Sequence, residues 1–117
     1  MQKKLDDIVK EAKGKQFGIA IDEAMQNDGY MKALEIIEAN PEIKQHPAVV
    51  KVADALMEQG EYEKAIELYN NQDRKDIAVK RYGWEIAQLQ KQKKYDQVIK
   101  LAGLLQEKGF DEVVISD

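Results

Sequence analysis

The feature that most constrains this chain of 117 residues is an internal repeat. Tyr30, Tyr62 and Tyr95 open the segments YMKALEII, YEKAIELY and YDQVIKLA, which align without a gap at offsets of 32 and 33 residues. Before each tyrosine, residues recur at i, i+3, i+4 and i+7, the spacing of one buried helix face. These sets are Phe17, Ala20, Ile21 and Ala24, then Val49, Val52, Ala53 and Leu56, then Tyr82, Glu85, Ile86 and Leu89. The sequence therefore predicts three tandem helix-turn-helix units.

The segments between the turn signals have the length of ordinary helices, and none alternates with a period of two. These signals are Asp28-Gly29, Asn40-Pro41, His46-Pro47, Gln59-Gly60 and Lys108-Gly109. Ahead of the repeats, an amphipathic helix is expected over 1–14, with Gly14 ending it; its apolar residues are Leu5, Ile8, Val9 and Ala12. The predicted fold class is therefore all-α, with about seven helices.

A lone helical hairpin cannot cover its own apolar face, so neighbouring hairpins are expected to stack on one another. We expect a single domain over 1–117. It consists of the capping helix 1–14, helical hairpins over 17–46, 47–72 and 73–108, and a tail over 109–117 that shields the last hairpin.

The middle copy, ADALMEQGEYEKAIELY, resembles the tetratricopeptide repeat (TPR). Gly60 lies at the turn, Tyr62 opens the second helix, Ala65 follows three residues later, and Tyr69 stands at the aromatic position. The resemblance covers residues 17–105. The chain departs from the family pattern at Val49, where the family has tryptophan, and the closing proline is missing from all three copies. The resemblance implies a right-handed α-solenoid that holds an extended peptide in a concave groove.

The first helix of each repeat lines that groove in the family. We place six candidate groove residues there: Asp22, Met25, Asp54, Met57, Trp84 and Gln90. Asp22 and Asp54 stand at equivalent positions and could hold a basic peptide through charge-assisted hydrogen bonds. The alternative is that both acids only hydrate a helix face. Trp84 lies off the apolar stripe, so it is either a binding hot spot or a cover for its own long helix.

The composition leaves few routes to catalysis. The chain has no cysteine, and its only histidine, His46, precedes Pro47 and is expected at a helix cap. Its only serine, Ser116, lies in the tail, so neither a zinc site nor a catalytic triad can be assembled. Neither GxGxxG nor GxxxxGK[ST] occurs. We therefore expect no enzyme activity, no metal and no cofactor.

The charges are unevenly distributed. Residues 17–73 hold 12 acids and 4 bases, whereas residues 74–100 hold 3 acids and 8 bases, in a chain of net charge −4. The basic third hairpin could form a nucleic-acid patch, but we interpret it as a hydrated face with ion pairs. With no signal peptide or membrane span, we expect a monomer in the cytoplasm, or a recombinant protein if the chain is designed. We expect no nucleic-acid or membrane partner.

These observations lead to two functional hypotheses. A long helix from about Asp73 to Lys93, spliced into a degenerate repeat, resembles a computationally designed (de novo) helical assembly and is also compatible with natural drift. The first hypothesis is a non-catalytic helical-repeat scaffold, designed or engineered, that has no specific biochemical activity and requires no partner. The second is a TPR-type interaction module that binds a peptide or protein in its concave groove.

Overall fold

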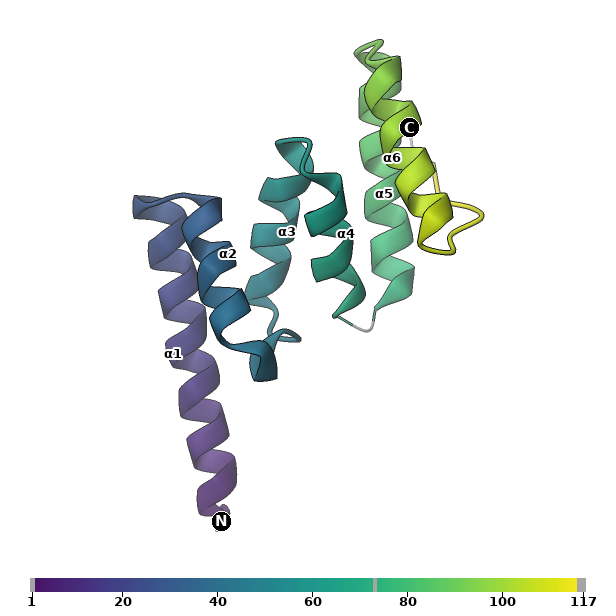
Figure 1. Cartoon of the computed structure of the whole chain (residues 1–117). Helices are drawn as coiled ribbons and strands as arrows, with labels where there is room; N and C mark the ends of the chain where they lie inside the picture. The colour runs from purple at the N-terminus through teal and green to yellow at the C-terminus, as the bar shows by residue number, and fades with distance from the viewer. Residues whose placement is uncertain (1, 73, 116–117) are drawn as a thin grey trace. The chain divides into compact units, whose positions relative to one another are not determined.

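The computed structural model describes residues 2–72 and 74–115, which form six α-helices and one short 3-10 helix (Figure 1). The elements follow in the order α1 (Leu5–Asn27), α2 (Tyr30–Ala39), η1 (Pro41–Ile43), α3 (Ala48–Glu58), α4 (Tyr62–Asn70), α5 (Lys75–Lys91) and α6 (Tyr95–Glu107). No strand occurs among the described residues, which confirms the all-helical prediction. The helices group into two compact units, Met1–Val52 (unit 1) and Ala53–Asp117 (unit 2), with the boundary inside α3.

The expectation that Gly14 ends a separate capping helix is wrong. Helix α1 runs from Leu5 to Asn27 and joins that segment to the first helix of the first hairpin, so the described residues hold six α-helices rather than seven. A glycine inside a helix costs only about 1 kcal/mol relative to alanine, and tertiary packing can offset that cost. Gly14 is not among the glycines with positive φ.

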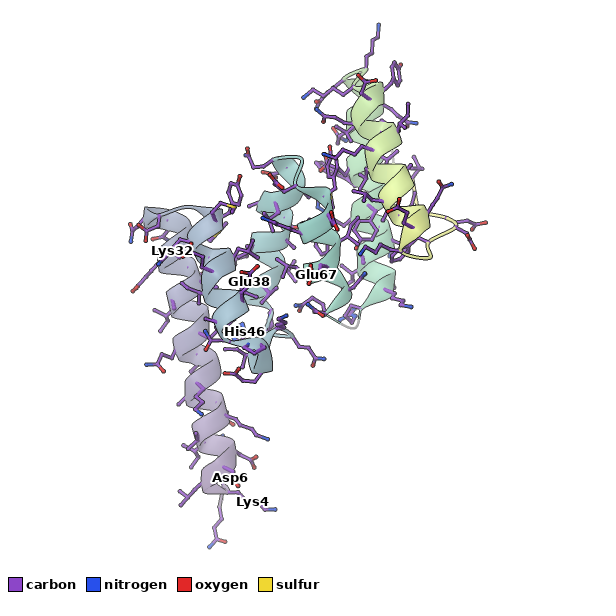
Figure 2. All side chains as sticks on the ribbon, viewed as in Figure 1. Lys4, Asp6, Lys32, Glu38, His46 and Glu67 are labelled. Carbon is purple, nitrogen blue, oxygen red and sulfur yellow. The ribbon has the colours of Figure 1, made fainter. Side chains whose placement is uncertain are left out.

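In unit 1, helices α1 and α2 lie side by side and antiparallel (Figure 1). Their contact buries apolar residues from both helices: Phe17, Ile21 and Ala24 from α1, and Ala33, Leu34 and Ile37 from α2. The N-terminal turns of α1, which follow Lys4 and carry Asp6, extend past the end of α2 (Figure 2). Leu5, Ile8 and Val9 in these turns are 78%, 45% and 51% exposed.

In unit 2, helix α4 contacts both α5 and α6, and these two helices contact each other. The buried residues keep the repeat spacing in α4 and α5: Tyr62, Ala65, Ile66 and Tyr69 in α4, and Tyr82, Ile86 and Leu89 in α5. Helix α6 departs from it, because it buries Leu101 and Leu105 and leaves Tyr95 and Ile99, which align with Tyr62 and Ile66, exposed. Tyr82 meets Tyr69 and Phe110 edge to face, with ring centroids 5.6 and 5.4 Å apart. Aromatic pairs favour this geometry because the positive ring edge faces the negative ring face.

The tail after α6 packs back onto α5. Phe110 contacts Tyr82, and the backbone of Val114 passes directly over Gly83. A Cβ atom at Gly83 would lie 1.7 Å from the carbonyl oxygen of Val114, so this approach requires glycine. Ser116 and the expected helix start at Asp73 lie outside the described residues.

Candidate functional site

The six candidate groove residues divide between the two units. Asp22 and Met25 belong to unit 1, and Asp54, Met57, Trp84 and Gln90 belong to unit 2.

In unit 1, Asp22 already has a partner from its own chain. Its Oδ1 atom lies 3.0 Å from Nζ of Lys51, and the two side chains are 47% and 64% exposed. Such an exposed ion pair contributes little stability, about 0 to 1 kcal/mol, and an incoming cation could replace the lysine. Met25 follows one turn later on α1 and is half-buried.

In unit 2, Asp54 belongs to a side-chain network that joins α3, α4 and α5. The Tyr69 hydroxyl and, at 3.3 Å, Nε of Arg81 both donate to Oδ1 of Asp54. Nη1 of Arg81 also donates to Oε1 of Glu85 at 3.1 Å. Burial and the hydrogen bond to Asp54 both raise the pKa of Tyr69 above its ordinary value of 10.0, so the hydroxyl keeps its proton and remains a donor.

The network also accounts for Glu85, the one carboxylate among the apolar positions of the repeat. The side chains of Arg81 and Glu85 are only 17% and 10% exposed, and a buried charge is tolerated when it is paired and hydrogen-bonded. Arg74 forms a further ion pair with Asp76 at 3.5 Å. Arginines of the basic third hairpin are thus partly neutralised inside unit 2.

The other candidates in unit 2 differ in accessibility. Met57 is 1% exposed, so it offers no side-chain surface to a peptide, whereas Gln90 is exposed in the last turn of α5. Trp84 is 45% exposed, and the guanidinium carbon of Arg81 lies 4.9 Å from the centroid of its ring, a cation–π contact.

Trp84 borders a shallow cavity of about 190 Å³, lined by Glu58, Tyr62, Trp84, Glu85, Gln88, Leu89, Gln92, Lys94 and Gln97. Tyr62 closes one side of this cavity: its hydroxyl donates to Oε1 of Gln97 at 3.2 Å, and Nζ of Lys100 lies 5.9 Å from its ring centroid. Pockets for drug-sized ligands usually measure about 300 to 1,000 Å³. The cavity is therefore better matched to one side chain of a partner than to a cofactor.

His46 lies in the segment between η1 and α3 (Figure 2) and packs against α1. Its Nδ1 accepts a hydrogen bond from the backbone N–H of Ala48 at 3.1 Å, which confirms the predicted cap. The imidazole meets Phe17 edge to face at 5.3 Å. It lies above Gly14 and Gly18, where added Cβ atoms would come within 3.7 and 3.2 Å of the ring. The i, i+4 spacing of these glycines is the sequence signal for this contact, and it was not among the predictions made from the sequence.

The residues at 2–72 and 74–115 contain no cluster of three or more His, Cys, Asp or Glu side chains arranged to hold a metal ion. Over the same residues, no helix combines the length and the apolar character needed to cross a membrane.

Comparisons of the chain with protein-family models, with curated proteins and with solved structures found no match.

Proposed function

We propose that the chain is a non-catalytic helical-repeat scaffold, built from stacked TPR-like hairpins. The observation that carries this proposal is the state of Asp54. The carboxylate that a basic peptide would need already accepts hydrogen bonds from Tyr69 and Arg81. Opening this network would leave partly buried charged groups without partners, which costs about 1 to 3 kcal/mol or more. Asp54 therefore serves to hold three helices together.

The packing of α4 supports the stacked arrangement. In a tandem repeat the second helix of one hairpin is covered by both helices of the next. Helix α4 contacts both α5 and α6, and its Tyr62 and Ile66 are only 2% and 0% exposed.

A second candidate function, peptide binding, is supported by Trp84. Its exposed ring and the adjoining cavity form an aromatic surface of the kind that often anchors a partner. A peptide held here would insert a side chain beside Trp84.

Titration calorimetry distinguishes the two functions. The scaffold proposal expects no saturable heat when the protein is titrated with a library of short basic and acidic peptides. Saturable heat that is lost in Trp84→Ala or in the double variant Asp22→Asn, Asp54→Asn, and kept in the control Ile77→Ala, would replace the scaffold proposal with the module. Ile77 suits this control because it is 47% exposed on the same helix as Trp84.

A further inference from the structure

Helix α6 exposes an apolar stripe that its counterpart α4 buries. Tyr95 and Ile99 align with Tyr62 and Ile66, yet they are 57% and 71% exposed, against 2% and 0%. Ala102 and Gly103 continue the stripe at helical spacing, and nothing lies within 4 Å of a Cβ atom built on Gly103. The reason for the difference is that α5 and α6 cover α4, whereas within the described part of the chain no further helix packs on this face of α6.

Helix α1 exposes a second apolar stripe, separate from the face that it packs in unit 1. Leu5, Ile8, Val9, Ala12 and Ile19 recur at heptad-like spacing, and Ile19 is 59% exposed. The buried face of α1, formed by Phe17, Ile21 and Ala24, points in a different direction on the helical wheel. Helix α1 therefore has two apolar faces and only one of them is covered within unit 1.

The packing of α4 on α5 shows how the two stripes could meet. Tyr62 of α4 shares its cavity with Trp84, Glu85, Gln88 and Leu89 of α5. In the repeat register these four positions of α5 correspond to Ile19, Ala20, Glu23 and Ala24 of α1. The same contact made between two molecules would place Tyr95 of one copy beside Ile19 and Ala20 of the other.

The charges at the helix ends favour this pairing in the antiparallel direction. Lys93 and Lys94 directly precede α6, whose dipole disfavours positive charge at that end, and Lys91 lies nearby in the last turn of α5. Glu23 and Asp28 lie near the C-terminal end of α1, whose last turn has no basic residue, and Asp22 beside them is paired with Lys51. Negative charge is disfavoured there for the same reason. An antiparallel contact brings the lysines beside the acids, whereas a parallel contact would bring them to the N-terminus of α1, where Lys3 and Lys4 are offset by Asp6 and Asp7 and the helix dipole is positive.

We propose that two copies of this chain associate end to end, with the Tyr95–Ile99 stripe of α6 in one copy packed against the Leu5–Ile19 stripe of α1 in the next. This inference rests on the proposed stacking of hairpins and replaces the monomer expected from the sequence. The two surfaces differ, so the contact is heterologous: each dimer keeps one free surface of each kind and can add further copies.

Sedimentation velocity of the full chain, from micromolar to millimolar concentration, tests the proposal with two variants that each disable one surface. Ile19→Lys places a lysine opposite the lysines of α6, and Ile99→Lys removes the apolar centre of the other stripe. We expect the mass of the wild type to rise with concentration and each variant alone to stay monomeric. A one-to-one mixture of the variants should give a species of twice the monomer mass and nothing larger, because only one intact pair of surfaces remains.

Met31→Lys is the matched control, since Met31 is 48% exposed on α2 and belongs to neither stripe; it should associate like the wild type. Two further variants, Lys94→Glu and Glu23→Lys, test the contribution of charge, and each should weaken association roughly tenfold or more. Mixed together, these two variants should associate more strongly than either does alone. Circular dichroism of every variant establishes that it is folded.

A wild type that stays monomeric at millimolar concentration would overturn the end-to-end proposal, and so would a single variant that still dimerises by itself. These outcomes are independent of the scaffold proposal, which is tested by whether added peptides give saturable heat of binding in calorimetry. A protein that stays monomeric and binds no peptide would contradict only the end-to-end contact.

Discussion

At the scale of single residues, Tyr82 shows how an aromatic ring and its hydroxyl can have opposite effects on the free energy of unfolding. The ring is fully buried between Tyr69 and Phe110, and it contributes the apolar contact that joins α4, α5 and the tail. The hydroxyl oxygen is buried without a hydrogen-bond partner among the described residues. Burying an unpaired polar group costs free energy, so the ring stabilises unit 2 while its hydroxyl opposes folding.

Tyr82→Phe should therefore stabilise the protein. We expect the free energy of unfolding to rise by about 1 kcal/mol, because the substitution keeps the ring and removes the unpaired hydroxyl. The urea midpoint at neutral pH measures the change. Tyr95→Phe serves as the control, since Tyr95 is exposed and should leave the midpoint unchanged. A lower midpoint for Tyr82→Phe would show that the hydroxyl has a partner in solution.

The buried tyrosines also predict a loss of stability in alkali. Burial raises the pKa values of Tyr69 and Tyr82 above 10.0, and for Tyr69 the hydrogen bond to Asp54 adds to the effect. Above about pH 10 the unfolded chain loses protons that the folded chain keeps, so the free energy of unfolding must fall as pH rises further. Below that pH both states are protonated and these groups cause no change.

Urea midpoints between pH 8 and pH 11 would measure this dependence. The double variant Tyr69→Phe, Tyr82→Phe should lose less stability over this range than the wild type, because two of the linked groups are gone. Equal slopes in the two proteins would contradict the assignment to these tyrosines.

At the scale of elements, the turns between helices depend on residues in the left-handed region of φ. Gly60, before α4, has a positive φ of 80°, and Gly29, before α2, also has a positive φ. The position equivalent to Gly60 before α6 is Lys93, with φ of 59°. A side chain in this region costs about 1 to 2 kcal/mol because Cβ approaches the following carbonyl oxygen. The third turn therefore has the same geometry as the second but carries strain.

Lys93→Gly should relieve that strain. We expect a gain of about 1 kcal/mol in the free energy of unfolding, since the saving in the folded state exceeds the extra entropy of glycine in the unfolded state. Thermal and urea unfolding measure this gain in the free energy of unfolding. Lys91→Gly, inside the last turn of α5, should instead be destabilising, and a gain in both variants would point to charge rather than backbone strain.

The uninterrupted α1 gives the opposite prediction for a glycine. Gly14→Ala should raise helix stability by about 0.5 to 1 kcal/mol, because Gly14 is helical and alanine loses less backbone entropy there. A methyl group would fit, since its nearest neighbour is Cδ2 of His46 at 3.7 Å. A higher helix content by circular dichroism and a higher unfolding midpoint are the expected results. Lower values would mean that the helix breaks at Gly14 in solution.

At the scale of the whole molecule, the two terminal segments differ in how far they pack against their own unit. The C-terminal tail covers part of α5 through Phe110 and Val114, whereas the N-terminal turns of α1 have no cover within unit 1. The tail leaves an apolar face of α6 in contact with water, because Tyr95 and Ile99 stay exposed.

Gly83→Ala should detach the tail from α5. The new Cβ would lie 1.7 Å from the carbonyl oxygen of Val114, and the helix is less able to move than the tail. The NMR signals of the Val114 methyl groups and the Phe110 ring should therefore shift towards random-coil values while α5 stays helical. Gly103→Ala is the matched control, because a methyl group there meets nothing within 4 Å. Unchanged tail signals in Gly83→Ala would contradict the observed packing.

Local chemistry in the sequence was sufficient for several features. The 3.6-residue periodicity identified the helices, the Asp28-Gly29 and Gln59-Gly60 pairs located two turns, and the His46-Pro47 pair located a cap. These signals act within one or two helical turns, so one stretch of chain is enough to interpret them. The candidate peptide groove could not be predicted from such local signals, because it depends on how separate helices face each other.

The sequence by itself determined that the chain is helical, where most of its turns fall and which helix faces are apolar, because each depends on side chains and backbone angles close together in the chain. Only the tertiary structure decided that α1 continues through Gly14, that Asp54 is held by Tyr69 and Arg81, and that Gly83 makes room for Val114. These outcomes depend on contacts between residues far apart in the chain, whose free energies outweigh the local preferences of a glycine or a carboxylate.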